Sequence, residues 1–234
     1  IDHQVMPLPA NLRLNAFKYP IAFIRLIELL FIIIALSSIN GWFYNLTFNC
    51  PTNSTRAVIR KVEFTTFSFD SIKVGSCDKV EDGIPLWKQG EGFTASAGFF
   101  YFVQIIALIS LLGGIFLYVV LWDFYKEEGR ARLGDLALTA LCFILFFFCS
   151  SIWWSSSNGI GFAGSAEQVK QLIQENPRFG SADFDPSVSI STKNSLLTIS
   201  VLCAWVSVIL YAVNAWFIWK EIAPIPESIP TSIA

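Results

Sequence analysis

The side-chain types that most often carry catalysis or bind metal ions are scarce in this sequence. His3 is its single histidine, and no group of histidine, cysteine and carboxylate residues has the spacing of a metal site. The sequence also lacks a glycine-rich phosphate loop, a nucleophile elbow and an HExxH helix. These features predict a protein that is not an enzyme and that needs no metal ion or cofactor.

The residues most able to do chemistry are Arg25 and Glu28, which lie within a long apolar stretch. They are three positions apart, so a helix places them on one face, where opposite charges can pair. Charges inside a membrane are costly and often functional, which makes partner binding or ion conduction one interpretation of this intramembrane charge pair. The other is structural anchoring, because both residues lie near the start of the stretch and each lowers the cost of burying the other.

Further polar and small residues interrupt the apolar stretches at Gln104, Gly113, Gly114 and Asn214. Small residues let helices approach closely, and amide side chains can bond from one helix to the next, so these positions are predicted to be helix packing points. A pore lining is the alternative, although none of the stretches repeats a polar face at helical spacing.

A third group of residues fits the spacing proposed for contact with cholesterol. It consists of Leu121, Tyr125 and Arg130, which lie at and just beyond the end of the second apolar stretch. An aromatic residue near a basic one is also typical of the membrane interface in general. Sterol contact and interface anchoring are therefore both open for these three residues.

Composition explains why such residues stand out. Hydrophobic residues make up 54% of the chain and charged residues 15%, whereas soluble domains carry roughly a quarter charged residues. The net charge of −2 offers no basic surface for nucleic acid, which excludes that class of partner. Four stretches are long and apolar enough to cross about 30 Å of hydrocarbon, which takes about 20 residues. The predicted spans are residues 21–44, 95–122, 136–154 and 195–219.

The predicted fold is an all-α membrane protein with one four-span domain, residues 21–219. An even number of spans puts both termini on one side of the membrane and the two long loops on the other. Basic residues in short segments favour the cytosol, and those of the termini and the turn therefore predict cytosolic termini. The other segments are a tail at 1–20, lumenal loops at 45–94 and 155–194, a cytosolic turn at 123–135 and a tail without ordered structure at 220–234.

The first long loop carries two cysteines and two glycosylation sequences. Cys50 and Cys77 would lie in an oxidising lumen, which favours a disulfide over the alternative of two free thiols. Asn45 and Asn53 each begin an Asn-x-Ser/Thr sequence, and we expect glycosylation at Asn53, because Asn45 lies almost at the membrane edge. Alternating and β-branched residues between the cysteines predict a small sheet closed by the disulfide. A short helix is predicted near residues 165–175 of the second loop.

Several stretches of the chain follow a recognisable order. The first span begins KYPIAFIRLIE at residues 18–28, and the last ends NAWFIWKE at residues 214–221. Between them lie Cys50, Asn53, Thr55, Ser76, Cys77, Tyr125, Asp135 and Trp153. Together these stretches resemble the synaptophysin family, within the wider group of MARVEL-domain proteins, over nearly the whole chain.

This resemblance implies a four-helix MARVEL bundle in the membrane of synaptic or secretory vesicles, with Arg25 and Glu28 as family features. The implied function is to organise vesicle partners during exocytosis and vesicle recycling. The implied partners are synaptobrevin, the membrane sector of the vacuolar proton pump, membrane lipids with cholesterol, and further copies of the chain. Two features depart from the family. Residues 155–194 lack the usual cysteine pair, and residues 220–234 lack a long tail rich in glycine, proline and tyrosine.

Two other functions fit the same fold. An oligomeric channel or transporter of the vesicle membrane would place Arg25, Glu28, Gln104 and Asn214 around a pore. A junctional or trafficking protein outside vesicles would share the fold and differ only in location.

Overall fold

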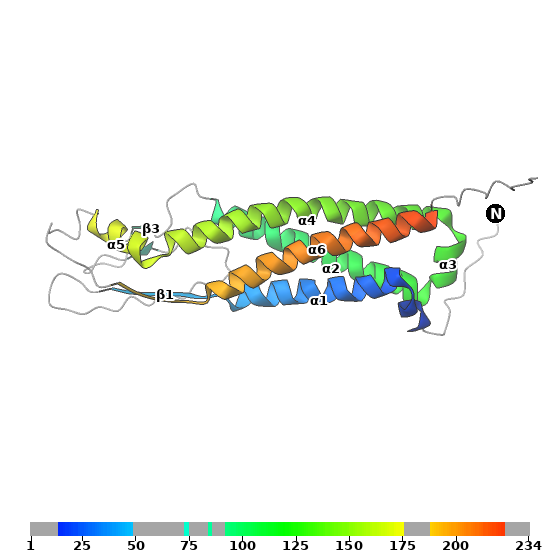
Figure 1. The fold of residues 1–234 in the computed structure, drawn as a ribbon, viewed down its shortest axis with the longest axis horizontal. Helices are drawn as coiled ribbons and strands as arrows, with labels where there is room; N and C mark the ends of the chain where they lie inside the picture. Colours follow the sequence, from blue (N-terminus) through cyan, green and yellow to red (C-terminus); the bar gives the residue numbers. More distant parts are fainter. Residues whose placement is uncertain (1–13, 49–72, 75–83, 86–91, 176–187, 223–234) are drawn as a thin grey trace, which may run out of the picture.

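Four long helices form an antiparallel bundle, and they dominate the computed structural model (Figure 1). The structure describes residues 14–48, 73–74, 84–85, 92–175 and 188–222. All four helices are long and apolar enough to cross a membrane, which confirms the predicted bundle of four spans. Their bounds are α1 Pro20–Gly41, α2 Phe93–Val120, α4 Gly129–Ala163 and α6 Asn194–Ile222.

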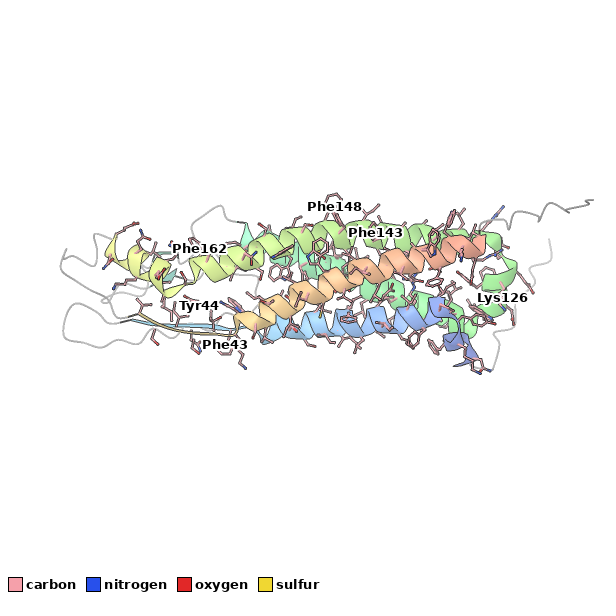
Figure 2. All side chains as sticks on the ribbon, viewed as in Figure 1. Phe43, Tyr44, Lys126, Phe143, Phe148 and Phe162 are labelled. Carbon is pink, nitrogen blue, oxygen red and sulfur yellow. The ribbon has the colours of Figure 1, made fainter. Side chains whose placement is uncertain are left out.

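The helices form a closed ring in which each has two main neighbours. α1 packs against α2 and α6, and α4 packs against the same two helices. Large apolar side chains are exposed on all four spanning helices, and side chains project outward along the length of the bundle (Figure 2). Because lipid tails are as apolar as these side chains, helix association in a membrane depends on interior packing and polar contacts rather than on the hydrophobic effect.

The helix boundaries at one end follow from local backbone chemistry. Pro20 takes the first position of α1, where its missing N–H is not needed, and Tyr19 before it is extended. A short 3-10 helix, η1 (Leu14–Lys18), precedes them. α2 ends where the backbone of Leu121 leaves the helical region, and α3 (Trp122–Glu127) then closes this end of the bundle (Figure 1).

The connection between the second and third spans differs from the predicted turn at residues 123–135. Only Glu128 separates α3 from α4, and α4 begins at Gly129. The predicted third span began after the last charged residue, whereas helix α4 includes that charge, which finds partners. Asp135 consequently lies in the second turn of α4.

At the opposite end, regular structure continues beyond the predicted spans. α4 contains 35 residues and is therefore about 52 Å long, far more than the roughly 30 Å of hydrocarbon. A helix of this length exceeds that thickness, and α4 continues through residues 155–163, where the sequence predicted a loop. α5 (Ala166–Gln174) follows and coincides with the predicted short helix.

A two-stranded sheet joins the two long loops at this end. β1 (Tyr44–Phe48) pairs antiparallel with β4 (Val188–Thr192), and Asn45 lies opposite Ser191. Tyr44 was predicted to end the first span, but α1 stops at Gly41. The second loop is thus more regular than its glycine and proline content indicated.

Part of the predicted structure of the first loop lies outside the described residues. The described residues of this loop include two short antiparallel strands, β2 (Lys73–Val74) and β3 (Ile84–Pro85). Cys50, Cys77 and Asn53 lie outside the described ranges, so the disulfide that would brace this region stays a prediction. The cysteines within the described ranges are buried free thiols of the spanning helices, namely Cys142, Cys149 and Cys203.

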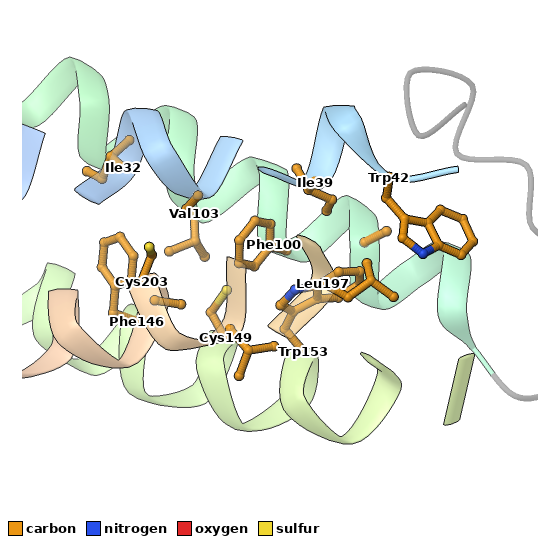
Figure 3. Packing of buried hydrophobic residues seen from close by; sticks show 14 of the residues in the cluster. Ile32, Ile39, Trp42, Phe100, Val103, Phe146, Cys149, Trp153, Leu197 and Cys203 are labelled. Atoms are coloured by element: carbon orange, nitrogen blue, oxygen red, sulfur yellow. The ribbon is translucent and has the colours of Figure 1, made fainter. Parts of the chain in front are cut away.

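Aromatic side chains fill the bundle interior toward the sheet. Phe100 of α2 packs against Trp153 of α4, with ring centroids 5.1 Å apart (Figure 3). The Trp153 indole donates a hydrogen bond of 2.9 Å to Ser200 Oγ of α6, which satisfies its polar atom inside the core. Three helices are thereby held together at one level of the bundle.

Tyr44 connects the sheet to the end of α4. Its hydroxyl donates a hydrogen bond of 3.0 Å to the Gly164 carbonyl, and burial raises the pKa of the phenol, which keeps the donor protonated. A Cβ on Gly164 would lie 2.9 Å from Tyr44 Cε2. Space, not backbone conformation, requires glycine here, because the φ of Gly164 is −84°.

Gly164→Ala should lower the free energy of unfolding by about 1–3 kcal/mol, the usual cost of adding a methyl group to a tightly packed site. Thermal unfolding of the full chain in mild detergent, followed by circular dichroism, measures the effect. Gly113→Ala is the matched control, because a Cβ there meets nothing within 4 Å. Equal stability of the two variants would contradict the close packing of Tyr44 on Gly164.

Candidate functional site

A buried group of charged and polar side chains lies at the α3 end of the bundle. Arg25 and Glu28 of α1 form an ion pair, with Nη1 3.1 Å from Oε2. The same guanidinium reaches α4, where Nη2 lies 2.9 Å from Asp135 Oδ1 and also donates to Thr139 Oγ1. One arginine therefore contacts two carboxyl groups and bridges two helices.

Asp135 extends these contacts to α2 and α3. Its Oδ2 accepts a hydrogen bond from the Tyr118 hydroxyl of α2 and one of 3.2 Å from the Tyr125 hydroxyl of α3. Burial and the charge of Asp135 raise the pKa of Tyr125, so its hydroxyl remains a donor. Thr139 Oγ1 donates to the backbone carbonyl of Asp135 at 2.7 Å, which ties the two α4 residues together.

The last helix, α6, joins through Asn214 and Tyr211. Asn214 Nδ2 lies 3.5 Å from Glu28 Oε1, a long hydrogen bond to the second carboxylate oxygen. The guanidinium carbon of Arg25 is 5.7 Å from the centre of the Tyr211 ring, within cation–π range. All four spanning helices and α3 thus contribute to one group, here named the buried ionic cluster. Its members are Arg25, Glu28, Tyr118, Tyr125, Asp135, Thr139, Tyr211 and Asn214.

The buried ionic cluster is closed to the surroundings of the chain. The exposed fractions are 3% for Arg25, 0% for Glu28 and 7% for Asp135. Gly114 of α2 lies against the cluster, where a Cβ would be 3.7 Å from Arg25 Nε, an ordinary contact distance. Buried charges persist when they are paired and hydrogen-bonded, and both carboxyl groups here use both of their oxygens.

This geometry is suited to fixing helices rather than to moving protons for a substrate. A general acid or base must come within hydrogen-bond reach of a reacting group, and the enclosed carboxyl groups are already engaged by this chain's own donors. Within the described ranges, no group of three or more His, Cys, Asp or Glu side chains could hold a metal ion. The cluster therefore connects the helices of the bundle through polar contacts.

Comparison with known families supplies a second observation. The MARVEL family, described as a membrane-associating domain, matches residues 16–217. The chain belongs to the MARVEL family. Every member of the buried ionic cluster lies within the matched segment, and the family's description agrees with a multi-pass membrane protein of four apolar helices.

The predicted packing points have different surroundings in this MARVEL bundle. Gly114 and Asn214 face the buried ionic cluster. Gln104 is fully buried, and among the described residues neither of its amide atoms has a hydrogen-bond partner. Gly113 is exposed, and a Cβ there would touch nothing within 4 Å. Gly113 thus contacts no other helix among the described residues, because successive residues of a helix point about 100° apart, and its role as a packing point stays a prediction.

The residues with the spacing for cholesterol contact do not share an exposed face of the MARVEL bundle. Tyr125 is buried, Leu121 is half-buried and Arg130 is exposed. The Tyr125 hydroxyl is also bonded to Asp135, so the structure does not offer it to a sterol. Sterol contact through this set would have to use Leu121 and Arg130 without the aromatic residue.

Sequence reasoning missed Asp135 as a partner of Arg25. The two residues are 110 positions apart, and Asp135 was predicted to lie in a turn, where a charge needs no partner. A usable signal was the four-residue spacing of Asp135 and Thr139, which puts a hydroxyl one turn from a carboxylate at the start of an apolar helix. Tyr118 and Tyr211 gave no such signal, because aromatic residues are common near membrane interfaces.

Arg25→Met should destabilise the bundle by about 3–5 kcal/mol, because it leaves two buried carboxyl groups without their cation. Adding Glu28→Gln and Asp135→Asn should recover part of that loss, since both uncompensated charges are then removed. Unfolding of each variant in the same lipid and detergent mixture measures the differences.

Arg130→Met is the matched control, because Arg130 is an exposed arginine near the start of α4. It should change stability little. Similar losses for Arg25→Met and Arg130→Met would contradict the assigned role of the buried ionic cluster.

Proposed function

We propose that this MARVEL protein is a non-enzymatic organiser of synaptic or secretory vesicle membranes. In this proposal it holds partner proteins together during exocytosis and vesicle recycling. The partners are synaptobrevin and the membrane sector of the vacuolar proton pump, and the protein also associates with itself and with cholesterol-rich membrane.

The observation that carries the proposal is the convergence of residues on which the resemblance to the synaptophysin family depends. These residues come from distant segments of the chain, yet five of them meet in the buried ionic cluster: Arg25, Glu28, Tyr125, Asp135 and Asn214. A resemblance confined to one span could arise from shared apolar composition. Residues that bond to one another across four helices instead support a shared way of fixing the bundle.

The charge distribution supports cytosolic termini. The first and last described residues lie at the α3 end of the bundle (Figure 1). Basic residues of short segments favour the cytosol, and this end carries Lys18, Lys126, Arg130, Arg132 and Lys220. The sheet and α5 then face the vesicle lumen, where the proposed disulfide between Cys50 and Cys77 is chemically favoured.

Side-chain burial argues against an oligomeric channel built from the polar residues of the spans. A pore between copies needs its lining side chains on the outer surface of each bundle. Arg25, Glu28, Gln104 and Asn214 are instead at most 3% exposed and face the inside of one bundle. The proposal therefore assigns these residues to stability and not to conduction.

A partner's span fits the outer face of α2. Ile109, Leu112 and Phe116 are exposed at helical spacing on this helix, and Gly113 is exposed beside them. An exposed glycine lets a second helix approach closely, which an unbroken row of bulky side chains does not. In this proposal the partner's span packs at Gly113, while the lumenal loops contact the partner outside the membrane.

Gly113→Phe should reduce crosslinking of the chain to synaptobrevin and to the proton pump several-fold, because the added ring holds a partner helix away. Crosslinking of native vesicles followed by mass spectrometry measures the change. Ile33→Phe, at an exposed position of α1, is the control and should leave the crosslinks unchanged.

Reduction of the vesicles should also weaken the crosslinks if the Cys50 and Cys77 disulfide braces the docking loop. Crosslinks only between copies of the chain, indifferent to reduction, would contradict the organiser proposal. Partner crosslinks found only at cell junctions would assign the protein to a junctional membrane instead of a vesicle membrane.

Asn53→Gln should remove the N-linked glycan, whereas Asn45→Gln should leave it in place. Asn45 lies in β1, only four residues after α1 ends at Gly41, and is therefore close to the membrane edge. Gel mobility before and after N-glycosidase digestion distinguishes the variants. A chain without any glycan would speak against lumenal loops, and loss of the glycan in Asn45→Gln would reverse the assignment of the site.

A further inference from the structure

A cavity of about 320 Å³ lies at the α3 end of the bundle, beside the buried ionic cluster. Residues of α3, α4 and α6 line it, together with the residue that precedes α1. The lining consists of Tyr19, Trp122, Tyr125, Lys126, Arg132, Lys220 and Glu221. An adjoining cavity of about 370 Å³ shares Tyr19, Trp122 and Lys126 with it. The volume of either cavity is within the range of sites for small molecules, about 300–1,000 Å³.

Three cations from three helices converge on the first cavity, which we call the basic cavity. They are Lys126 of α3, Arg132 of α4 and Lys220 of α6, and Glu221 is the one carboxylate in the lining. Within the described part of the chain, none of the three cations has a carboxylate at ion-pair distance. Arg132 Nε is also buried without a hydrogen-bond partner there. The basic cavity therefore has an excess of positive charge and unused donors.

The basic cavity lies at the depth of lipid headgroups. Tyr19 directly precedes α1, Trp122 follows α2, and Lys220 belongs to the last turn of α6. Spanning helices end where hydrocarbon gives way to headgroups, and aromatic side chains mark that level. Lys126 Nζ lies 5.3 Å from the centre of the Tyr19 ring and 5.1 Å from that of Trp122, so cation–π contacts hold its charge at the cavity wall.

Other acidic residues at this end leave the lining positive. Asp123, Glu127 and Glu128 are exposed and do not line the basic cavity. Asp135 lies behind Tyr125, and its oxygens are bonded within the buried ionic cluster. Glu221 is the exception, because it would repel an anion from within the lining.

We propose that the basic cavity binds the headgroup of a phosphorylated phosphatidylinositol from the surrounding leaflet. Basic pockets between spanning helices at the membrane surface are known sites for such headgroups. Three cations from three helices match a headgroup with several phosphates better than a headgroup with a single charge. Tyr19 and Trp122 supply apolar walls for the inositol ring of the headgroup.

The acyl chains of the lipid then extend along the outside of the bundle. The site does not depend on the proposed vesicle function, because it requires only a membrane.

Fluorescence anisotropy of a labelled phosphatidylinositol bisphosphate, titrated into the full chain in phosphatidylcholine nanodiscs, tests this proposal. Arg132→Gln and Lys126→Gln should each weaken binding about fivefold, the effect of one cation near a membrane surface. Glu221→Gln should strengthen binding by a similar factor, because it removes the repelling charge.

Arg130→Gln and Lys18→Gln are the matched controls, because both cations are exposed at the same end but do not line the basic cavity. Both should leave the affinity unchanged. Equal weakening by Arg130→Gln and Arg132→Gln would reduce the effect to general surface charge and overturn the proposal. Arg132 also donates a hydrogen bond of 3.3 Å to the Glu221 carbonyl, so Lys126→Gln keeps the test decisive if Arg132→Gln disturbs the fold.

Competition distinguishes the lipid from soluble anions. Inositol trisphosphate and inorganic phosphate should displace the labelled lipid far less well than the unlabelled lipid does. Equal competition by inositol trisphosphate would assign the basic cavity to a soluble ligand and overturn the lipid proposal. Full displacement by phosphatidylserine would contradict recognition of several phosphates.

Discussion

The guanidinium of Arg25 forms the contacts on which the arrangement of the four helices depends. In a bilayer, apolar side chains gain little from packing on each other instead of on lipid, so directional polar contacts decide how helices are rotated and aligned. Arg25 contacts Glu28 on its own helix and Asp135 on α4. α1 and α4 are not main neighbours in the ring of helices, so this long side chain connects opposite corners of the bundle. Few other side chains could span that distance and present two donors to two carboxyl groups.

The two ends of the bundle are fixed by different kinds of contact. At the α3 end, hydrogen bonds to Asp135 from Tyr118 and Tyr125 hold α2 and α3 in place. At the other end, aromatic side chains hold the elements together. Trp153 is hydrogen-bonded to Ser200 in the core, and Tyr44 is hydrogen-bonded to Gly164 at the sheet. Each end is therefore fixed by polar atoms that are paired inside the protein. The apolar surface between them remains free for lipid or for another helix.

The sequence allowed the four spans to be predicted because their composition alone requires a membrane, and the spacing of Arg25 and Glu28 allowed their pairing to be predicted. It did not allow the contacts between distant segments to be predicted. Tyr44 continues an apolar run, and only the pairing of β1 with β4, set by residues far along the chain, makes it extended. In the sequence, Asp135 looks like a charged residue at the end of a span, and only its contact with Arg25 shows that it lies inside the bundle. Gly113 and Gly114 are equivalent in sequence, and only the rotation of α2 decides that Gly114 faces Arg25 while Gly113 faces outward.

Two charged regions lie side by side at the α3 end, and they are complementary. The buried ionic cluster holds one guanidinium against two carboxyl groups. The basic cavity holds three cations against one carboxylate, and Tyr125 belongs to both regions. Because Asp135 lies behind Tyr125, its charge moderates the repulsion among the cations when the basic cavity is empty. An entering anion must therefore be attracted more strongly by Lys126, Arg132 and Lys220 than it is repelled by Asp135 and Glu221. The net positive charge of the lining attracts a headgroup with several charges more strongly than one with a single charge, and Tyr125 connects this site to the contacts that fix the bundle.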